Sequence, residues 1–374
     1  MTIGLKCQKT PAALGYRMPP EWHHHSATWL AWPKDPETWP DRIPEVQEIF
    51  LKMISALAPY ETVHLLVDDE ATENDVRSRL RRQVEVQDRE IGVETPRRGV
   101  STPRGRYAHS VVFHRMPTVD SWIRDYGPNF ILRNTGELAY NDWTFNAWGN
   151  KYEELKKDNA IPSKLEGLLK IPRFEPGIVL EGGSIEVDGA GLCMTTEQCL
   201  LNRNRNPHLN RHQIENYLKN YLGVEKILWL GDGIAGDDTD GHIDDLARFV
   251  WPTTVVCAVE EDPQDENYKP LQDNCRRVRL ATNARGKRYE IVMLPMPGFV
   301  ADKGGRRLPA SYANFYIANN VVLAPMFGHP NDKRALETLQ KLFPWRHVIG
   351  VDCEPLALGM GTIHCVTQQQ PATN

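Results

Sequence analysis

The sequence has no long apolar run, no paired metal-binding cysteines and no excess of positive charge. No stretch approaches the ~18 apolar residues of a membrane helix, and residues 1–22 lack the apolar centre of a signal peptide. The 44 Lys and Arg residues are balanced by 49 Asp and Glu, which argues against a general binder of nucleic-acid phosphates. The seven cysteines are widely spread and form no C-x-x-C pair, a usage typical of reducing compartments. We therefore expect a cytoplasmic protein that binds neither membranes nor nucleic acids.

Several signatures of cofactor chemistry are also absent from the 374 residues. There is no G-x-x-x-x-G-K-[ST] and no G-x-S-x-G, so P-loop nucleotide binding and serine hydrolase chemistry are unsupported. Three consecutive histidines, His23, His24 and His25, cannot all face one ion in a regular element, so we expect no metal site there.

One pattern that is present combines an amphipathic helix, a Pro or Gly break and an apolar strand. It occurs at 50–67, 214–230 and 335–351, and it predicts a helix docked on the strand that follows it. Residues 1–15 are expected to be a loose lead-in. The charged, Arg-rich stretch 68–107 is expected to be a solvated loop or short helix and is the best candidate for an insertion.

A second pattern recurs about every 60 residues, a spacing longer than that of common repeat proteins. A polar cluster leads into an apolar strand, a turn and another strand, and the clusters centre on Asp125, Glu181, His242, Asn314 and Cys365. The pattern predicts a mixed α/β unit repeated about five times, with the 27 Gly and 27 Pro residues supplying turns. In a circular array the five polar residues would meet at the axis. A last strand at 363–367 could pair with an early one such as 27–31 and remove exposed edges.

Two of the clusters contain carboxylates beside glycines. In a strand, His242 and Asp244 would share a face, and an imidazole oriented by a carboxylate suits a general base. Glu181 precedes Gly182 and Gly183, which allow a ligand or a neighbouring backbone to approach closely. The alternatives are a solvated acidic turn at His242 and an exposed strand-start glutamate at Glu181.

The cluster at 122–128 would, as a strand, place Trp122 and Arg124 on one face and Asp125 on the other. Its alternative is a surface pair between Arg124 and Asp125. In a strand His364 would point away from the side chain of Cys365, so a structural role for that histidine is expected.

In the last cluster Cys365 follows the glycine-rich segment 359–361, which would let a ligand come close to the thiol. A buried cysteine is usually inert, which is the alternative for Cys365 and the expectation for the other six.

One thiol, one imidazole and three carboxylates would be unsuited to acyl transfer, because the carboxylates would repel an oxyanion. They suit a planar cation instead. A guanidinium group presents a fork of N–H donors that carboxylates bind bidentately, which would hold its carbon for attack by sulfur.

The segments that contain these polar clusters resemble the agmatine deiminases of the guanidine-modifying pentein superfamily. The similarity covers essentially the whole chain, and its most specific combination is LEGGS, DGHID and IHCVTQQQP in that order. The resemblance implies one domain over 1–374 with a five-bladed α/β propeller of pseudo-fivefold ββαβ-type units around a central active site.

The resemblance also implies roles for individual residues. Cys365 would be the nucleophile, His242 the acid and base, and Glu181 its partner in proton transfer. Asp125 and Asp244 would hold the guanidinium nitrogens. The remaining substrate contacts would come from the glycine loop beside the thiol and from two residues near the substrate's tail: Gly361, Trp122 and Asp238.

The implied reaction releases ammonia, passes through a thiouronium intermediate and leaves a ureido product. For agmatine this product is N-carbamoylputrescine, a polyamine precursor, and no metal or organic cofactor is needed. Alternatives are a deiminase of arginine, peptidyl arginine or another guanidine, an amidinotransferase, and a non-catalytic binding module. A homo-oligomer is left open.

Overall fold

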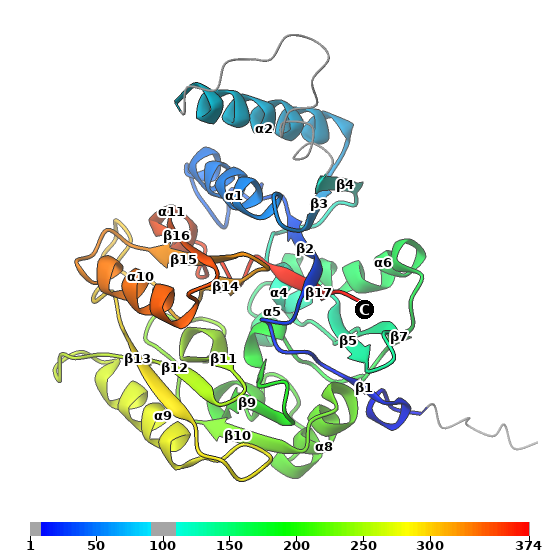
Figure 1. The fold of residues 1–374 in the computed structure, drawn as a ribbon, viewed down its shortest axis with the longest axis vertical. Coiled ribbons are helices and arrows are strands. Elements are labelled where there is room, and N and C mark those ends of the chain that lie inside the picture. The colour runs from blue at the N-terminus through cyan, green and yellow to red at the C-terminus, as the bar shows by residue number, and fades with distance from the viewer. Residues whose placement is uncertain (1–8, 91–109, 374) are drawn as a thin grey trace, which may run out of the picture.

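The structure is a computed structural model that describes residues 9–90 and 110–373, and its strands form five separate sheets (Figure 1). Three sheets have three strands each. They consist of β8 (Glu186–Val187), β9 (Leu192–Thr196) and β10 (Lys226–Leu230); β11 (Ala247–Trp251), β12 (Thr254–Val259) and β13 (Glu290–Pro295); and β14 (Tyr316–Ile317), β15 (Val321–Met326) and β16 (His347–Asp352). Each pairs an antiparallel hairpin with a parallel third strand, so the same unit recurs.

The other two sheets have four strands each. One is ordered β1 (Tyr16–Arg17), β5 (Asn129–Arg133), β6 (Leu138–Asn141) and β7 (Arg173–Phe174). The other is ordered β17 (Gln368–Pro371), β2 (His25–Ala31), β3 (Thr62–Val67) and β4 (Val111–Arg115). The mixed α/β class is therefore confirmed, and the turns expected between paired strands lie where the sequence places them.

The predicted helix–break–strand patterns are confirmed in all three places. They form α1 (Ile43–Leu57) before β3, α8 (Arg211–Leu222) before β10, and α10 (Asn331–Leu342) before β16. In the second of these, Asn210 and Gln213 form a capping box at the start, and Gly223 ends the helix with a φ of 67°. The further helices of six or more residues are α2 (Glu70–Glu90), η2 (Glu154–Ala160), α6 (Ile161–Leu169) and α9 (Tyr268–Leu280).

The expectation of a loop or short helix at 68–107 is wrong for its first part. Residues 70–90 form the 21-residue helix α2, which links the parallel strands β3 and β4. Its Val76 is fully buried, and the guanidinium groups of Arg77 and Arg79 lie over the rings of Phe113 and Trp32. The long arginine stems thus cover apolar surface, which the charge-rich sequence concealed. The remainder, 91–107, lies outside the described residues, as do residues 1–8, Cys7 included.

The last strand of the described chain pairs with an early one, as expected. β17 pairs antiparallel with β2, with Gln368 opposite Trp29, but it begins after the predicted segment 363–367. Residues 363–367 instead form a turn, in which the backbone N–H of Thr367 donates to the carbonyl of His364 at 3.1 Å. None of the helices in 9–90 and 110–373 combines the length and apolar character needed to cross a bilayer.

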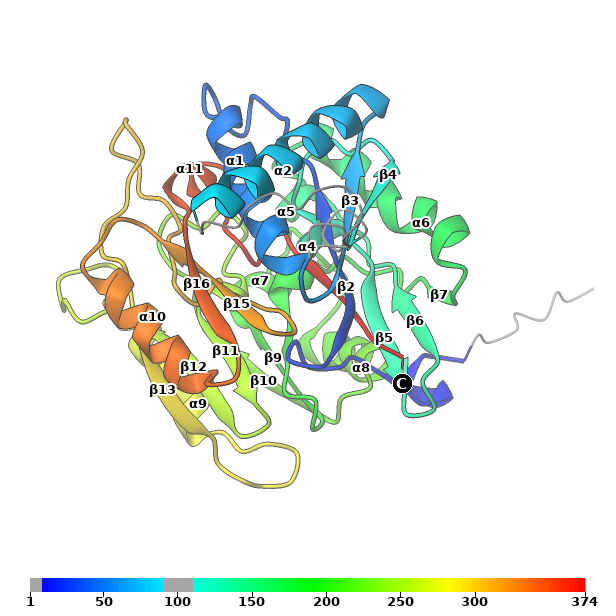
Figure 2. The same ribbon diagram turned by 45° about the horizontal axis from the view of Figure 1, so that its top comes forward.

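The long helices lie on the outer side of the sheets, while several short helical turns lie nearer the middle of the molecule (Figures 1 and 2). Among the short turns, η3 (Gly182–Ser184) contacts both α4 (Ile123–Tyr126) and η4 (Ile243–Asp245). The strands predicted at 122–126 and 242–245 are therefore corrected to single helical turns that precede β5 and β11. The remaining short elements are η1 (Ala12–Leu14), α5 (Ala147–Asn150), α7 (Glu197–Leu200) and α11 (Glu354–Ala357).

Candidate active site

The thiol of Cys365 lies buried in the 363–367 turn, against the side chain of Asn314. The Oδ1 atom of Asn314 accepts hydrogen bonds from Thr362 Oγ1 at 2.7 Å and from the His364 backbone N–H at 3.0 Å. Its amide N–H group therefore faces the sulfur, with Nδ2 at 3.3 Å from Sγ. Burial, with the carboxylates of Asp244, Asp245 and Asp125, holds the pKa of Cys365 well above its usual value. The thiol is consequently protonated until a positive charge arrives.

A cavity of about 1130 Å³ opens onto this thiol. Its lining includes Cys365, Asp125, Trp122 and Asp238, so four of the predicted site residues face one space. Ten carboxylate side chains and three cationic ones line the whole cavity. Such an excess of negative charge concentrates cations in a cleft and disfavours anionic ligands.

Two carboxylates near the thiol are held by different partners. Asp125, on α4, accepts hydrogen bonds from Trp148 Nε1 and from the Gly183 backbone N–H, both at 2.9 Å. Burial raises the pKa of Asp125 to about 6. Asp244 Oδ2 lies 3.9 Å from the sulfur and accepts from His364 Nδ1 at 2.7 Å. Burial acts to raise the pKa of Asp244, but the bond from His364 more than offsets it, so this carboxylate is ionised.

His242 directly precedes η4 and is almost completely buried. Its Nδ1 lies 3.8 Å from Asp125 Oδ1, which is too long for a hydrogen bond but within the distance of an ion pair. Burial alone would lower the pKa of His242, yet the Asp125 carboxylate raises it well above the ordinary value. The imidazole therefore carries a proton that it can donate.

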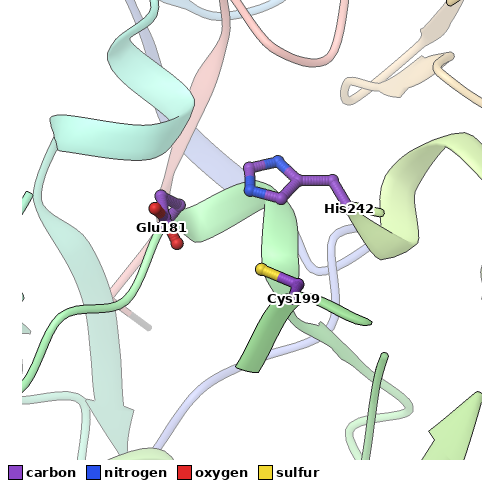
Figure 3. A group of neighbouring side chains, drawn as sticks. All are labelled: Glu181, Cys199 and His242. Carbon is purple, nitrogen blue, oxygen red and sulfur yellow. The ribbon is translucent and has the colours of Figure 1, made fainter. Parts of the chain in front are cut away.

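Glu181 lies next to His242, and its carboxylate is positioned by an arginine. Arg205 Nε donates to Glu181 Oε1 at 2.6 Å, and the same guanidinium contacts Asp240 Oδ2 at 2.6 Å. Figure 3 shows the imidazole of His242 beside Glu181 and Cys199. A carboxylate oxygen, a ring nitrogen and the Cys199 sulfur all lie within 4.8 Å of one another.

Behind Asp244 is a chain of buried ion pairs that the sequence did not predict. His364 Nε2 lies 2.6 Å from Glu21 Oε2, and Glu21 Oε1 lies 2.8 Å from the Arg248 guanidinium. Arg248 also contacts Glu186, with Nε 3.0 Å from Oε2. The expectation that His364 points away from the side chain of Cys365 assumed a strand at 363–367, but this segment is a turn. The His364 imidazole instead lies between Asp244 and Glu21 and links them.

Arg124 is likewise not half of a surface pair with Asp125. It is buried and donates from one terminal nitrogen to Gln369 Oε1 at 2.7 Å and from Nε to the His364 carbonyl at 3.2 Å. Its other terminal nitrogen lies 3.4 Å from Glu21. The Arg124 side chain thus fixes the turn that carries Cys365.

Two glycines bring the backbone close to the reacting groups. A Cβ atom on Gly183 would lie 2.6 Å from His242 Nδ1, 2.9 Å from Asp125 Oδ1 and 3.0 Å from Asp244 Oδ2. These three side chains therefore converge on a single point. A Cβ on Gly361 would lie 3.2 Å from the Cys365 sulfur and 2.7 Å from the Trp122 ring. Both positions require glycine for space.

Replacing Gly183 with alanine should lower kcat/KM by at least about 100-fold, because the added methyl group displaces the imidazole and both carboxylates. The loss should be mainly in kcat, measured by steady-state kinetics. Gly167→Ala is the control, since a Cβ there meets nothing within 4 Å in α6 and alanine favours a helix. Equal activity of Gly183→Ala and Gly167→Ala would contradict the convergence of the three side chains on Gly183.

The far part of the cavity contains Asp238, whose carboxylate accepts a hydrogen bond from the Tyr152 hydroxyl. Burial raises the pKa of Asp238 from its ordinary value. Lys151 Nζ binds the Asp238 carbonyl and lies 2.9 Å from Asp240 Oδ1. The carboxylate of Asp238 is therefore one of the acidic groups that line this part of the cavity, as the sequence predicts.

The histidine run at 23–25 is engaged in ordinary hydrogen bonds. His25 Nε2 lies 2.7 Å from the Glu21 carbonyl, and its Nδ1 lies 3.3 Å from Glu61 Oε1. Among the described residues, three side chains lie close enough to hold a metal ion together: Glu181, Cys199 and His242.

Comparison with known proteins gives consistent matches over almost the whole chain. The family of Porphyromonas-type peptidyl-arginine deiminases matches residues 17–371. An agmatine deiminase of Medicago truncatula is 37% identical over 397 residues, which cover 98% of this chain and 99% of that protein. A solved agmatine deiminase of Enterococcus faecalis has a TM-score of 0.85 at 33% identity, covering 98% of this chain and 99% of that one. A C. jejuni agmatine deiminase with substrate bound has a TM-score of 0.79 at 32% identity, covering 95% and 96%.

Proposed function

This chain belongs to the family of Porphyromonas-type peptidyl-arginine deiminases, and we propose that it is a hydrolase that converts agmatine to N-carbamoylputrescine and ammonia. One observation carries the proposal. The Cys365 thiol lies in an acidic cavity between carboxylates and beside a protonated imidazole, an arrangement suited to a cationic carbon electrophile. The product is a precursor of putrescine.

We propose that Asp125 and Asp244 bind the guanidinium nitrogens of the substrate. Asp244 Oδ1 is buried and has no hydrogen-bond partner among the described residues, which leaves it free to accept from a guanidinium. Bringing a cation next to Cys365 offsets the carboxylates that keep the thiol protonated, so the thiol releases its proton to solvent and the thiolate forms when substrate is bound. The Asn314 N–H group then stabilises the negative sulfur.

The reaction then runs in two halves. The thiolate attacks the guanidinium carbon to form a C–S bond, and His242 donates its proton to the departing nitrogen, which leaves as ammonia. The remaining group is a thiouronium on Cys365. The now neutral His242, supported by Glu181, accepts a proton from water as the water attacks, and the C–S bond breaks to release the ureido product. No metal or organic cofactor takes part in these steps.

The tail of the substrate is the basis for preferring agmatine to arginine. We propose that the ammonium group of agmatine lies near Asp238, with the Trp122 ring along the chain of methylenes. Free arginine would bring a carboxylate into a cavity that has far more anionic than cationic side chains. Repulsion would weaken its binding.

A second candidate is a deiminase of peptidyl arginine or another large guanidine. It is favoured by the cavity volume of about 1130 Å³, which exceeds what agmatine fills. At the level of the fold, we propose that the five sheets are five units of a pentein-type propeller within one domain over 1–374, built around this site.

The test of the function is turnover of a substrate panel by the purified protein. We expect agmatine to release ammonia and a ureido product between pH 6 and 9, with arginine and a blocked arginine peptide at least about tenfold lower in kcat/KM. Turnover of the peptide above agmatine would favour the second candidate. No turnover of any member of the panel would contradict both.

The pH dependence should identify Asp125. Its pKa of about 6 means that the carboxylate gains a proton, and loses its charge, as pH falls through 6. Because kcat/KM reports the free enzyme, it should fall tenfold per pH unit below about pH 6. A bound guanidinium favours the ionised form, so the acid limb of kcat should lie at lower pH. If kcat and kcat/KM fell at the same acidic pH, or if kcat/KM stayed constant down to pH 5, the role of Asp125 would be contradicted.

A further inference from the structure

The buried thiol of Cys199 lies next to the proposed catalytic groups and has no function in the scheme above. It forms a cluster with two residues that do take part, and the cluster consists of Glu181, Cys199 and His242 (Figure 3), which come from the segment before η3, from α7 and from the residue before η4. One atom of each side chain, an oxygen, a sulfur and a nitrogen, lies within 4.8 Å of the other two. All three residues are at least nine-tenths buried, and Cys199 takes no part in the proposed reaction.

The cluster contains buried polar atoms without partners. Glu181 Oε2 and both ring nitrogens of His242 have no hydrogen-bond partner in the part of the chain that the structure describes. Buried polar atoms nearly always have one, so each such atom calls for an explanation. Glu181 Oε1 is already bound to Arg205, which leaves Oε2 as the oxygen free to bind a ligand. The unpartnered atoms thus belong to the residues that surround the Cys199 sulfur.

A thiolate, an imidazole and a carboxylate are the ligand types that Zn²⁺ prefers, and three protein ligands with an open fourth position form a common zinc site. Bond lengths of ~2.0–2.3 Å imply that the ligand atoms lie roughly 3.3–3.8 Å apart in a tetrahedral site. Contraction from 4.8 Å needs shifts of about 1 Å, which side-chain rotation can supply. The nearby Arg205 is already paired with both Glu181 and Asp240, so its charge is compensated.

We propose that Glu181, Cys199 and His242 form a binding site for a borderline-soft divalent cation such as Zn²⁺, and that its occupation reversibly inhibits the enzyme. When the metal binds, the Cys199 thiol and the protonated His242 imidazole each lose a proton to solvent, because the ligands are a thiolate and a neutral imidazole. The bound ion then occupies the imidazole and the carboxylate that the reaction uses for proton transfer. Metal binding itself does not depend on the proposed function, whereas the inhibition does.

Cobalt is a direct probe of the site, because a thiolate bound to Co²⁺ gives a charge-transfer absorption band in the near ultraviolet. The experiment uses the full chain carrying Cys365→Ala, so that the nucleophile cannot bind the metal. Titration with Co²⁺ should produce the band, and Zn²⁺ should displace it. Adding Cys199→Ala should abolish the band and weaken Zn²⁺ binding by at least about 100-fold. Adding Cys193→Ala instead, another buried thiol outside the cluster, should leave both unchanged.

A band that persists without Cys199, or that never appears in the Cys365→Ala background, would overturn the site. If the Cys199→Ala protein fails to fold by circular dichroism, Cys199→Ser carries the same test. The inhibition is measured separately in proteins that retain Cys365. Cys199→Ala should keep agmatine turnover, while the Zn²⁺ concentration for half inhibition rises at least about tenfold. Equal Zn²⁺ sensitivity of the two proteins would overturn the inhibitory role alone.

Discussion

Replacing Cys365 with alanine is expected to abolish turnover while leaving substrate binding intact. The sulfur is the atom proposed to form the covalent bond, and Cys365 is the one cysteine among the described residues that line the cavity. Loss of a catalytic nucleophile typically lowers kcat by at least about 10⁴-fold. The binding groups Asp125 and Asp244 are untouched, so calorimetry should give a Kd for agmatine within about threefold of the substrate affinity of the unmodified protein.

The matched control for this variant is Cys193→Ala. Cys193 lies in β9, is fully buried and has a thiol whose pKa is raised by burial, as that of Cys365 is. The control should retain activity, which separates the effect of losing a buried thiol from the effect of losing this one. Turnover by Cys365→Ala near the rate of the unmodified protein would show that the nucleophile has been misassigned.

The elements that the sequence predicted well are those whose signals are local. The hairpins around Asn134–Gly136, Asp188–Gly189 and Asn319–Asn320 follow from turn residues between apolar runs, and all three appear in the structure. The helix–break–strand units follow from an apolar period that changes at a Pro or Gly. Their recurrence also predicted that residues far apart in the sequence meet, and the structure brings Asp125, His242 and Asp244 around Gly183.

The local conformation of the site was predicted less well. Residues 122–126 and 243–245 precede apolar strands, and the predicted strands were extended back into them, while residues 363–367 were themselves predicted to be the last strand. Their backbone instead turns, which places adjacent side chains on the same side of the chain. His364 and Cys365 can therefore both contact Asp244, which a strand would have prevented.

The buried ion pairs had little signal in the sequence. Glu21 and His364 are 343 positions apart, and their contact exists because β17 and the segment before β2 meet in the folded chain. Glu21 lies in GYRMPPEW (15–22) and Arg205 in LLNRNRNP (200–207), two segments in which the sequence predicted no role for either residue. A charged residue in an otherwise apolar or turn-rich segment was the one clue available, because such residues are rarely buried unless paired.

The second large effect is expected at Asp244, where asparagine should lower kcat/KM for agmatine by about 10²–10³-fold. Its carboxylate is ionised because His364 donates to Oδ2, while Oδ1 is unpartnered and available to a guanidinium. Removing the charge from one partner of a buried, hydrogen-bonded charge pair costs about 2–5 kcal/mol. Both KM and kcat should change, since the same carboxylate binds the cation and favours its approach to the sulfur.

Asp245, the residue after Asp244, provides the control for this variant. Burial and the adjacent Asp244 carboxylate raise the pKa of Asp245 well above its ordinary value, whereas the pKa of Asp244 is lowered. Asp245→Asn keeps the shape of a side chain that has no proposed contact with the guanidinium, and we expect less than about a fivefold change in kcat/KM. Asp244→Asn removes a full negative charge from the same turn. If both variants lose activity equally, the effect arises from packing of η4, and the guanidinium contact assigned to Asp244 is wrong.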